Sequence, residues 1–162
     1  MDGSLQTQDK HTYSDDDLRL GMELLFYAYR DFIGPPDEIL RERQFGRAHH
    51  RVIHFVGRNP GITVRELLSI LRITKQSLSR VMSDLLREGI VQQEQGTEDR
   101  RQRLLSLSDK GRTFETKVSQ SQRDRIAVSF ASAGPEAVEG FRKVLLSMIS
   151  DPADVRKFQG EG

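Results

Sequence analysis

A short stretch between two possible strands holds the most concentrated charge chemistry of this sequence. In QQEQGTEDRRQRLLSLSDKGR, residues 92–112, Asp99 stands beside Arg100 and Arg101, and Arg103 follows two positions later. An exposed turn needs no such charges, whereas guanidinium groups bind phosphate and carboxylate oxygens through paired hydrogen bonds. The residue types at this tip therefore indicate contact with an anion.

A second polar group falls on one predicted helix, in TKQSLSRVMSDLLREG. Thr74 is its expected N-cap and Gly89 its C-cap. Apolar residues recur between them at spacings of three and four, which predicts a buried face. The other faces carry small or hydrogen-bonding side chains, namely Lys75, Gln76, Ser77, Ser79, Arg80, Ser83 and Arg87.

The residue types argue against an enzyme. The chain has no cysteine, which excludes thiol nucleophiles, cysteine-ligated zinc and thiol-based redox sensing. No glycine-rich phosphate loop or nucleophile elbow is present. His50 and His54, four residues apart on one predicted helix, are weak candidates for a shared metal or haem, but two ligands make an incomplete site and packing is the commoner role. We expect no catalytic residue, no metal and no cofactor.

The chain has 162 residues and 36% hydrophobic content, which predicts a single domain or one domain with an oligomerisation extension. Its apolar runs are far shorter than the roughly 20 residues that span a bilayer, and no signal-peptide pattern opens it. We therefore expect a cytoplasmic protein without membrane contact. The net charge is only +1, so attraction to an anion must come from local patches.

The pattern along the chain is helical, with one hairpin. The expected elements are a helix from Ser14 to about Gly34–Pro36, a helix at 45–59, a short helix with a Thr63–Glu66 capping box, the helix at 74–88, two strands around a tip at 96–101, a helix capped by Ser108, and a helix from Pro135 through Ile149.

This order predicts a winged helix-turn-helix within a mainly α fold that has a small β-hairpin wing. Such a unit places its second helix in the major groove of DNA, where Arg favours guanine and Gln favours adenine. We therefore predict double-stranded DNA as the partner. The predicted DNA-contacting residues are Thr74, Lys75, Gln76, Ser77, Ser79, Arg80, Ser83, Asp99, Arg100, Arg101 and Arg103.

Two other interpretations stay open. In the first, the polar residues of the 74–88 helix form an ordinary solvated face. The capped helix before it and the charged hairpin after it argue against this interpretation, because the three features together would rarely occur by chance. In the other, the wing contacts a protein, and the domain is an interaction module without specific DNA binding.

The sequence resembles the multiple-antibiotic-resistance regulators, the MarR family of dimeric bacterial transcription factors, over roughly residues 18–150. DRRQRLLSLSDKG is similar to the wing signature of that family, with Ser108 where Thr is usual. LLREGIV resembles the family's exit from the recognition helix, and FGRAHHRVIHFV resembles its PetP-like branch.

The resemblance implies roles for the tip residues. Arg101 would enter the minor groove, where the narrow groove is strongly negative, and Asp99 would orient an arginine side chain. Arg100 and Arg103 would contact phosphates or the scaffold, and for Arg103 a packing or salt-bridge role is an equal alternative.

The outer helices, roughly 15–32, 109–132 and 135–149, carry more apolar residues than a small winged domain needs, which indicates a homodimer and an inverted-repeat operator. The resemblance also implies a repressor, or less often an activator, that is modulated by a small effector. Aromatic residues that could line an effector pocket, but that we expect mostly in the core, are Phe26, Tyr27, Tyr29, Phe32, Phe45 and Phe55.

The expected organisation is a flexible tail at 1–13, an N-terminal dimerisation helix and linker at 14–45, a winged helix-turn-helix DNA-binding domain at 46–108, C-terminal dimerisation helices at 109–150 and a flexible tail at 151–162.

Overall fold

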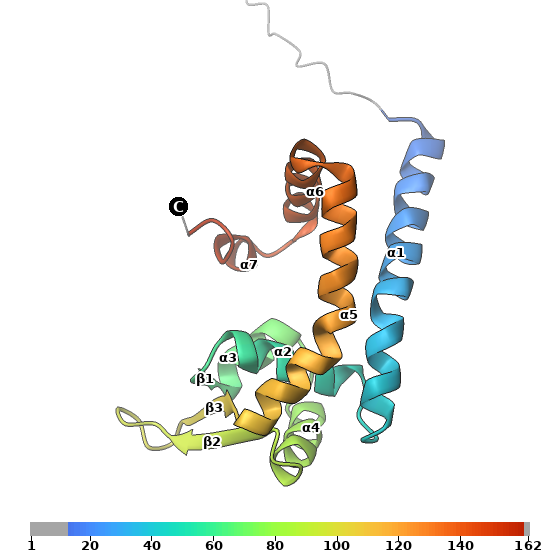
Figure 1. Ribbon diagram of the computed structural model, residues 1–162. Helices are drawn as coiled ribbons and strands as arrows, with labels where there is room; N and C mark the ends of the chain where they lie inside the picture. Colours follow the sequence, from blue (N-terminus) through green and yellow to red (C-terminus); the bar gives the residue numbers. More distant parts are fainter. Residues whose placement is uncertain (1–12, 161–162) are drawn as a thin grey trace, which may run out of the picture. The chain divides into compact units, whose positions relative to one another are not determined.

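The computed structural model describes residues 13–160, and its fold is mainly α-helical with one small sheet (Figure 1). The expected fold class is confirmed. The chain forms two units, one that ends at Gly34 and one that begins at Pro35. The elements are α1 (Asp15–Arg41), α2 (Arg47–Arg58), β1 (Ile62–Thr63), α3 (Val64–Leu71), α4 (Lys75–Arg87), β2 (Val91–Gln95), β3 (Arg103–Leu107), α5 (Asp109–Ala133), α6 (Pro135–Met148) and α7 (Pro152–Arg156).

The first unit is the N-terminal part of α1. Ser14 caps it as expected, because its hydroxyl accepts a hydrogen bond from the Asp17 backbone N–H at 3.1 Å. The Asp17 carboxylate accepts in return from the Ser14 N–H at 3.0 Å. The expected tail at 1–13 lies, apart from Tyr13, outside the described residues.

The structure corrects the expected end of this first helix. α1 continues through Pro35 and Pro36 to Arg41, although each proline removes a backbone donor. Pro36 and Leu40 are buried in the second unit, and Leu40 belongs to its hydrophobic core. Packing of this last turn offsets the lost hydrogen bonds, so tertiary contacts override the local stop signal.

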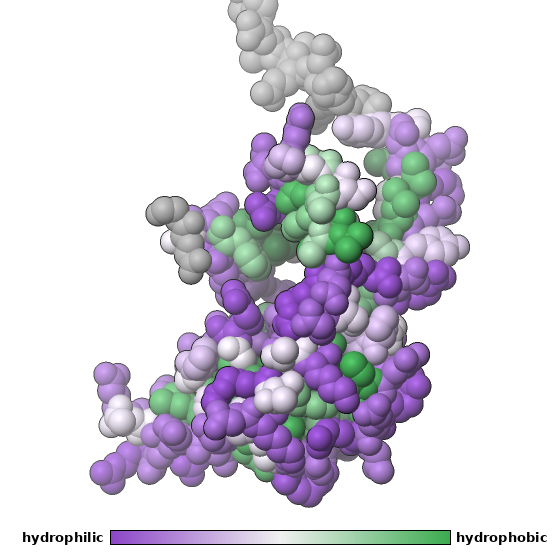
Figure 2. All heavy atoms as spheres, viewed as in Figure 1, coloured by the Kyte–Doolittle hydropathy of each residue, from purple (hydrophilic) through white to green (hydrophobic). Residues whose placement is uncertain are grey.

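The helix α6 follows α5 after Gly134, with Pro135 in its first turn as expected. It buries none of its residues. Phe141, Val144 and Met148 are 45%, 58% and 57% exposed, and Figure 2 shows hydrophobic atoms gathered over α6. This helix therefore keeps an apolar face in contact with solvent in the single chain.

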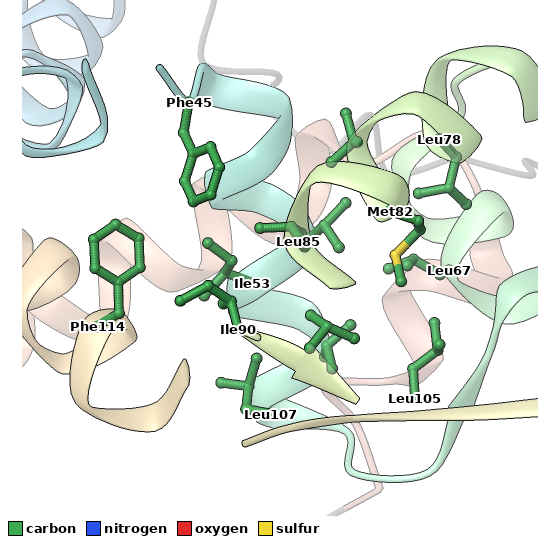
Figure 3. Close-up of a cluster of buried hydrophobic side chains, with 14 of the residues drawn as sticks. Phe45, Ile53, Leu67, Leu78, Met82, Leu85, Ile90, Leu105, Leu107 and Phe114 are labelled. Carbon is green, nitrogen blue, oxygen red and sulfur yellow. The ribbon is translucent and has the colours of Figure 1, made fainter. Parts of the chain in front are cut away.

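The core of the second unit lies between α2, α3, α4 and the sheet (Figure 3). Ile53, Leu85 and Ile90 point toward one another there, and Phe45 faces Phe114. The α4 residues buried in it are Leu78, Val81, Met82 and Leu85. Because burying one such side chain contributes about 1.5–3 kcal/mol, the apolar face of α4 fixes that helix on the scaffold.

The sheet is antiparallel with strand order β1-β3-β2. β2 pairs with β3 from Val91 opposite Leu107 to Gln95 opposite Arg103, which is the expected hairpin. β1 adds a third strand through Ile62 opposite Leu105. β1 was not predicted, because two residues are too few to show an alternation.

The exit of α4 is bonded directly to the start of α5, at a place that we call the α4–α5 junction (residues 88–90 and 108–111). Ser108 caps α5 as expected, accepting from the Gly111 N–H at 2.9 Å. The same hydroxyl donates to the Gly89 carbonyl at 2.6 Å, and the Lys110 ammonium donates to the Glu88 carbonyl at 2.6 Å. A Cβ at Gly111 would overlap the Ile90 carbonyl, so glycine permits this close approach.

The structure also corrects the expected tail at 151–162, because residues 152–156 form α7. The Asp151 carboxylate accepts from the Ala153 N–H at 2.8 Å, and Pro152 opens the helix. The Arg72 guanidinium, at the end of α3, contacts the carboxylates of Asp151 at 2.9 Å and Asp154 at 3.3 Å. The Asp-Pro pair is a helix-start signal that the sequence analysis overlooked. Residues 161–162 lie outside the description.

Between Tyr13 and Gly160, none of the helices is both long and apolar enough to cross a membrane.

Candidate nucleic-acid interface

The outer face of α4 carries every predicted reading residue. The side chains of Lys75, Gln76, Ser79, Arg80 and Ser83 are all exposed, opposite the buried stripe. The first turn of α4 contains no acid, so nothing on the helix itself neutralises the positive end of its dipole. This end of α4 is a favourable place for a phosphate.

The hydroxyl groups of α4 are partly engaged within the helix. Thr74 is the N-cap, because its hydroxyl accepts from the Ser77 N–H at 3.1 Å. It also donates to the Ser77 hydroxyl at 2.9 Å, and Ser83 donates to the Ser79 carbonyl at 3.0 Å. These bonds leave oxygen lone pairs facing solvent, whereas Lys75, Gln76 and Arg80 extend their donors outward.

The wing tip, residues 96–102, is a closed turn with its own hydrogen bonds. The Gly96 N–H donates to the Gln102 carbonyl at 3.0 Å, and the Gln102 N–H donates to the Asp99 carbonyl at 3.1 Å. The Gln95 amide donates to the Arg100 carbonyl at 2.9 Å. Gln95 is a supporting residue that sequence analysis did not identify, since a glutamine on a strand carries no signal of this contact.

Asp99 has a different partner from the one that the family resemblance implies. Its carboxylate accepts from the Arg101 backbone N–H at 2.9 Å, the pattern of an Asx turn. Asp99 thus shapes the backbone that presents Arg101, instead of holding an arginine side chain. A Cβ at Gly96 would lie 2.5 Å from the Asp99 carbonyl oxygen, so the turn requires glycine there.

The cations of this surface lack acidic partners. Within residues 13–160, no acid forms an ion pair with Lys75, Arg80, Arg100, Arg101 or Arg103, whereas Arg87 at the end of α4 pairs with Asp84 at 2.7 Å. The salt-bridge alternative for Arg103 therefore gains no support here. An exposed set of uncompensated guanidinium and ammonium groups attracts polyanions.

The two histidines that are weak metal candidates lie on α2, away from the predicted reading residues in sequence. Burial lowers the pKa of His50, as does the neighbouring His54, and burial likewise lowers the pKa of His54. The lowered pKa favours the neutral form of both rings. In the described part of the chain, no third histidine, cysteine or acid joins them in a group that could hold a metal ion.

An open cleft of about 540 Å³ lies beside the C-terminal end of α4. Its walls are charged or polar apart from Phe45, and the residues that line it are Glu42, Arg43, Gln44, Phe45, Asp84, Arg87 and Glu88. Of the aromatic residues suggested for an effector pocket, only Phe45 contributes to this cleft, and it is also a core residue.

The chain is similar in sequence to known proteins of one family. The MarR family profile matches residues 44–102. The chain is 48% identical over 146 residues to the HTH-type transcriptional regulator PetP of Rhodobacter capsulatus, an alignment that covers 90% of this chain and 87% of that protein.

Two solved structures share the fold. A MarR family transcription regulator matches with a TM-score of 0.69 and 18% identity, over 88% of this chain and 94% of that one. Streptococcus pneumoniae FabT in complex with DNA also matches with a TM-score of 0.69, at 19% identity, over 82% of this chain and 94% of that one.

The structural matches establish the winged fold, and the identity to PetP extends over nearly the whole of both chains. This chain therefore belongs to the MarR family of transcriptional regulators, which are DNA-binding proteins and not enzymes, as the resemblance in its sequence predicted.

Proposed function

We propose that this chain is a sequence-specific regulator that inserts α4 into the major groove of its operator and the wing tip into the adjacent minor groove. The carrying observation is the set of uncompensated cations on these two segments. Gln76, in the first turn of α4, and Arg80, one turn later, are exposed and suit base edges. Arg101 extends from a tip whose backbone is already closed and suits a narrow minor groove.

The operator we propose is an inverted repeat read by a homodimer. The exposed apolar face of α6 supports this assembly, because such a face is stabilised when a second copy covers it. We further propose that the regulator is a repressor, and that it works in the cytoplasm, where bacterial DNA lies. The family membership supports both points.

A small effector would modulate DNA binding in this proposal. The cleft beside α4 supports it, because a ligand there would touch Asp84 and Arg87 of the reading helix itself. Its charged walls favour a polar effector over an apolar one.

The test compares binding to the best duplex that the wild-type chain selects from a random library with binding to a scrambled duplex of equal composition. We expect preference for the selected duplex, and a fall in both affinities as salt rises, since each phosphate contact contributes about −0.9 to the logarithmic slope. Affinity that stays flat with salt, or equal affinity for both duplexes, contradicts the proposal.

Arg101→Ala is the matched variant at the wing. We expect it to weaken binding of the selected duplex by about 1–3 kcal/mol while the fold persists. Arg156→Ala, which removes an exposed arginine from α7, is the control and should leave affinity unchanged. Equal effects of the two variants would show that the wing tip has no special role.

A further inference from the structure

One partly buried imidazole connects the scaffold to the proposed reading helix. His49 lies in the first turn of α2, and its side chain is only 13% exposed. Its ring stacks on Phe45 with a centroid distance of 4.7 Å and an interplanar angle of 8°. Phe45 in turn packs edge-on against Phe114 of α5 at 6.0 Å. The ring plane of His49 is therefore fixed by core residues and not by solvent.

Both ring nitrogens of His49 are used, and their partners determine the tautomer. Nδ1 accepts a hydrogen bond from the Gly46 N–H at 3.0 Å, which caps the start of α2. Nε2 lies 2.9 Å from Oδ2 of Asp84 on α4. Because Nδ1 is an acceptor, the neutral ring carries its proton on Nε2, and that N–H donates to Asp84.

Asp84 is held in the charged form that best accepts this bond. The hydrogen bonds from His49 and then from Arg87 keep the pKa of the Asp84 carboxyl below its usual value. The Arg87 guanidinium donates to Oδ1 at 2.7 Å, so the two oxygens have different partners. A hydrogen bond to a charged group is stronger and more directional than an apolar contact.

The position of Asp84 matters for reading. It lies four residues after Arg80 and directly after Ser83, on the flank between the buried stripe and the exposed face of α4. The buried stripe holds α4 on the core, but apolar contacts are non-directional and tolerate small rotations about the helix axis. A directional bond from rigid α2 to this flank resists such rotation.

We propose that His49 is a positioning residue for operator recognition: through its Nε2–H bond to Asp84 it sets the rotation of α4 at which Gln76 and Arg80 meet base edges. This inference rests on the proposed function, since it concerns how α4 reads DNA. Base contacts need this alignment, whereas phosphate contacts tolerate its loss because they carry no sequence information.

Two conservative variants of His49 separate its two bonds. The Asn amide occupies the place of Nδ1, so His49→Asn retains an acceptor for Gly46 and loses the bond to Asp84. The Gln amide reaches the place of Nε2, so His49→Gln retains a donor for Asp84 and loses the α2 cap. Both variants lose the stacking on Phe45, so its effect cancels in the comparison.

The probes are the selected duplex and the scrambled duplex described above. We expect His49→Asn to weaken binding of the selected duplex about tenfold, because the rotation of α4 must then be fixed at the moment of binding. Binding of the scrambled duplex should stay within about twofold, since phosphate contacts dominate it. His49→Gln should keep most of the wild-type preference.

Variants of Asp84 test the same hydrogen bond through its acceptor. Asp84→Asn keeps an oxygen that accepts from Nε2–H and should retain the preference, whereas Asp84→Ala should lose about tenfold. Adding His49→Asn to Asp84→Ala should cause no further loss, because the two residues act through one bond. Thermal unfolding of each variant checks that the chain is folded.

The outcomes distinguish this inference from the function on which it rests. Wild-type preference in His49→Asn and Asp84→Ala overturns the positioning role alone. Equal loss in His49→Asn and His49→Gln also overturns it, because packing of the ring would then be the cause. A wild-type chain that binds both duplexes equally overturns the proposed function and this inference with it.

Discussion

The helices α4 and α6 are nearly equal in length, with 13 and 14 residues, and differ in how they use their apolar side chains. α4 buries four of them in the core of its own unit and presents a polar, cationic face. α6 buries none and presents Phe141, Val144 and Met148 (Figure 2). The two helices therefore need partners of opposite chemistry.

This contrast distinguishes helix faces whose apolar residues are already buried within the chain from faces whose apolar residues are not. A helix whose apolar stripe is buried needs no further contact for stability, so its exposed residues are free to meet a ligand. A helix that keeps its apolar stripe exposed still gains about 25 cal/mol for each Å² that a partner covers. We therefore propose DNA as the partner of α4 and a second protein surface as the partner of α6, and three variants test this proposal.

Met148→Glu should have the largest effect, on self-association. A carboxylate in an apolar contact must lose its hydration, so we expect dimer dissociation to become easier by about 2–4 kcal/mol. Sedimentation equilibrium over a range of protein concentrations measures this change. Ser147→Glu places the same side chain at an exposed neighbouring position and is the control. A Met148→Glu chain that associates as tightly as wild type would remove α6 from the interface.

Arg80→Ala should have the second largest effect. It should weaken DNA binding and leave self-association unchanged. We expect the selected duplex to bind about 1–3 kcal/mol more weakly, with relaxed preference at one base pair. Lys75→Ala is the informative companion, since a residue that contacts phosphate should weaken all duplexes alike. If Arg80→Ala weakens binding to every duplex by the same factor, Arg80 contacts phosphates and not a base.

Arg72→Ala should have the smallest effect of the three variants. It tests whether an exposed arginine that is paired with acids behaves differently from the unpaired arginines of α4 and the wing. The Arg72 side chain is 60% exposed, yet it pairs with Asp151 and Asp154. Exposed pairs contribute about 0–1 kcal/mol, so we expect a small loss in unfolding free energy that high salt abolishes. Urea unfolding at two salt concentrations measures it. A tenfold loss of DNA affinity would instead place Arg72 in the interface.

Local signals in the sequence predicted the helix starts, because capping depends on residues three or four positions apart. Thr63 with Glu66, Thr74 with Ser77, and Ser108 with Gly111 all cap as expected. The same local reasoning placed the end of α1 too early, since burial of Pro36 and Leu40 depends on distant residues.

In the candidate site too, features that depend on neighbouring residues were predictable from the sequence, and contacts between distant residues were not. Exposure of the polar α4 face follows from helical periodicity and is confirmed, while DNA contact by each named residue stays a prediction. The bond between His49 and Asp84 joins residues 35 positions apart. No spacing rule predicts it, because the pairing exists only once α2 and α4 pack together.

The α4–α5 junction has a mechanical consequence. Ser108 and Lys110 bond the exit of α4 to the start of a 25-residue helix, which is a stiff rod about 37 Å long at 1.5 Å per residue. A rod of that length converts a tilt of about 5° into a displacement of roughly 3 Å at its far end, and a small displacement at the far end into a rotation at the junction. α6 begins at that far end, so strain in a protein contact there would be transmitted as torque on α4, the helix that we propose to face DNA.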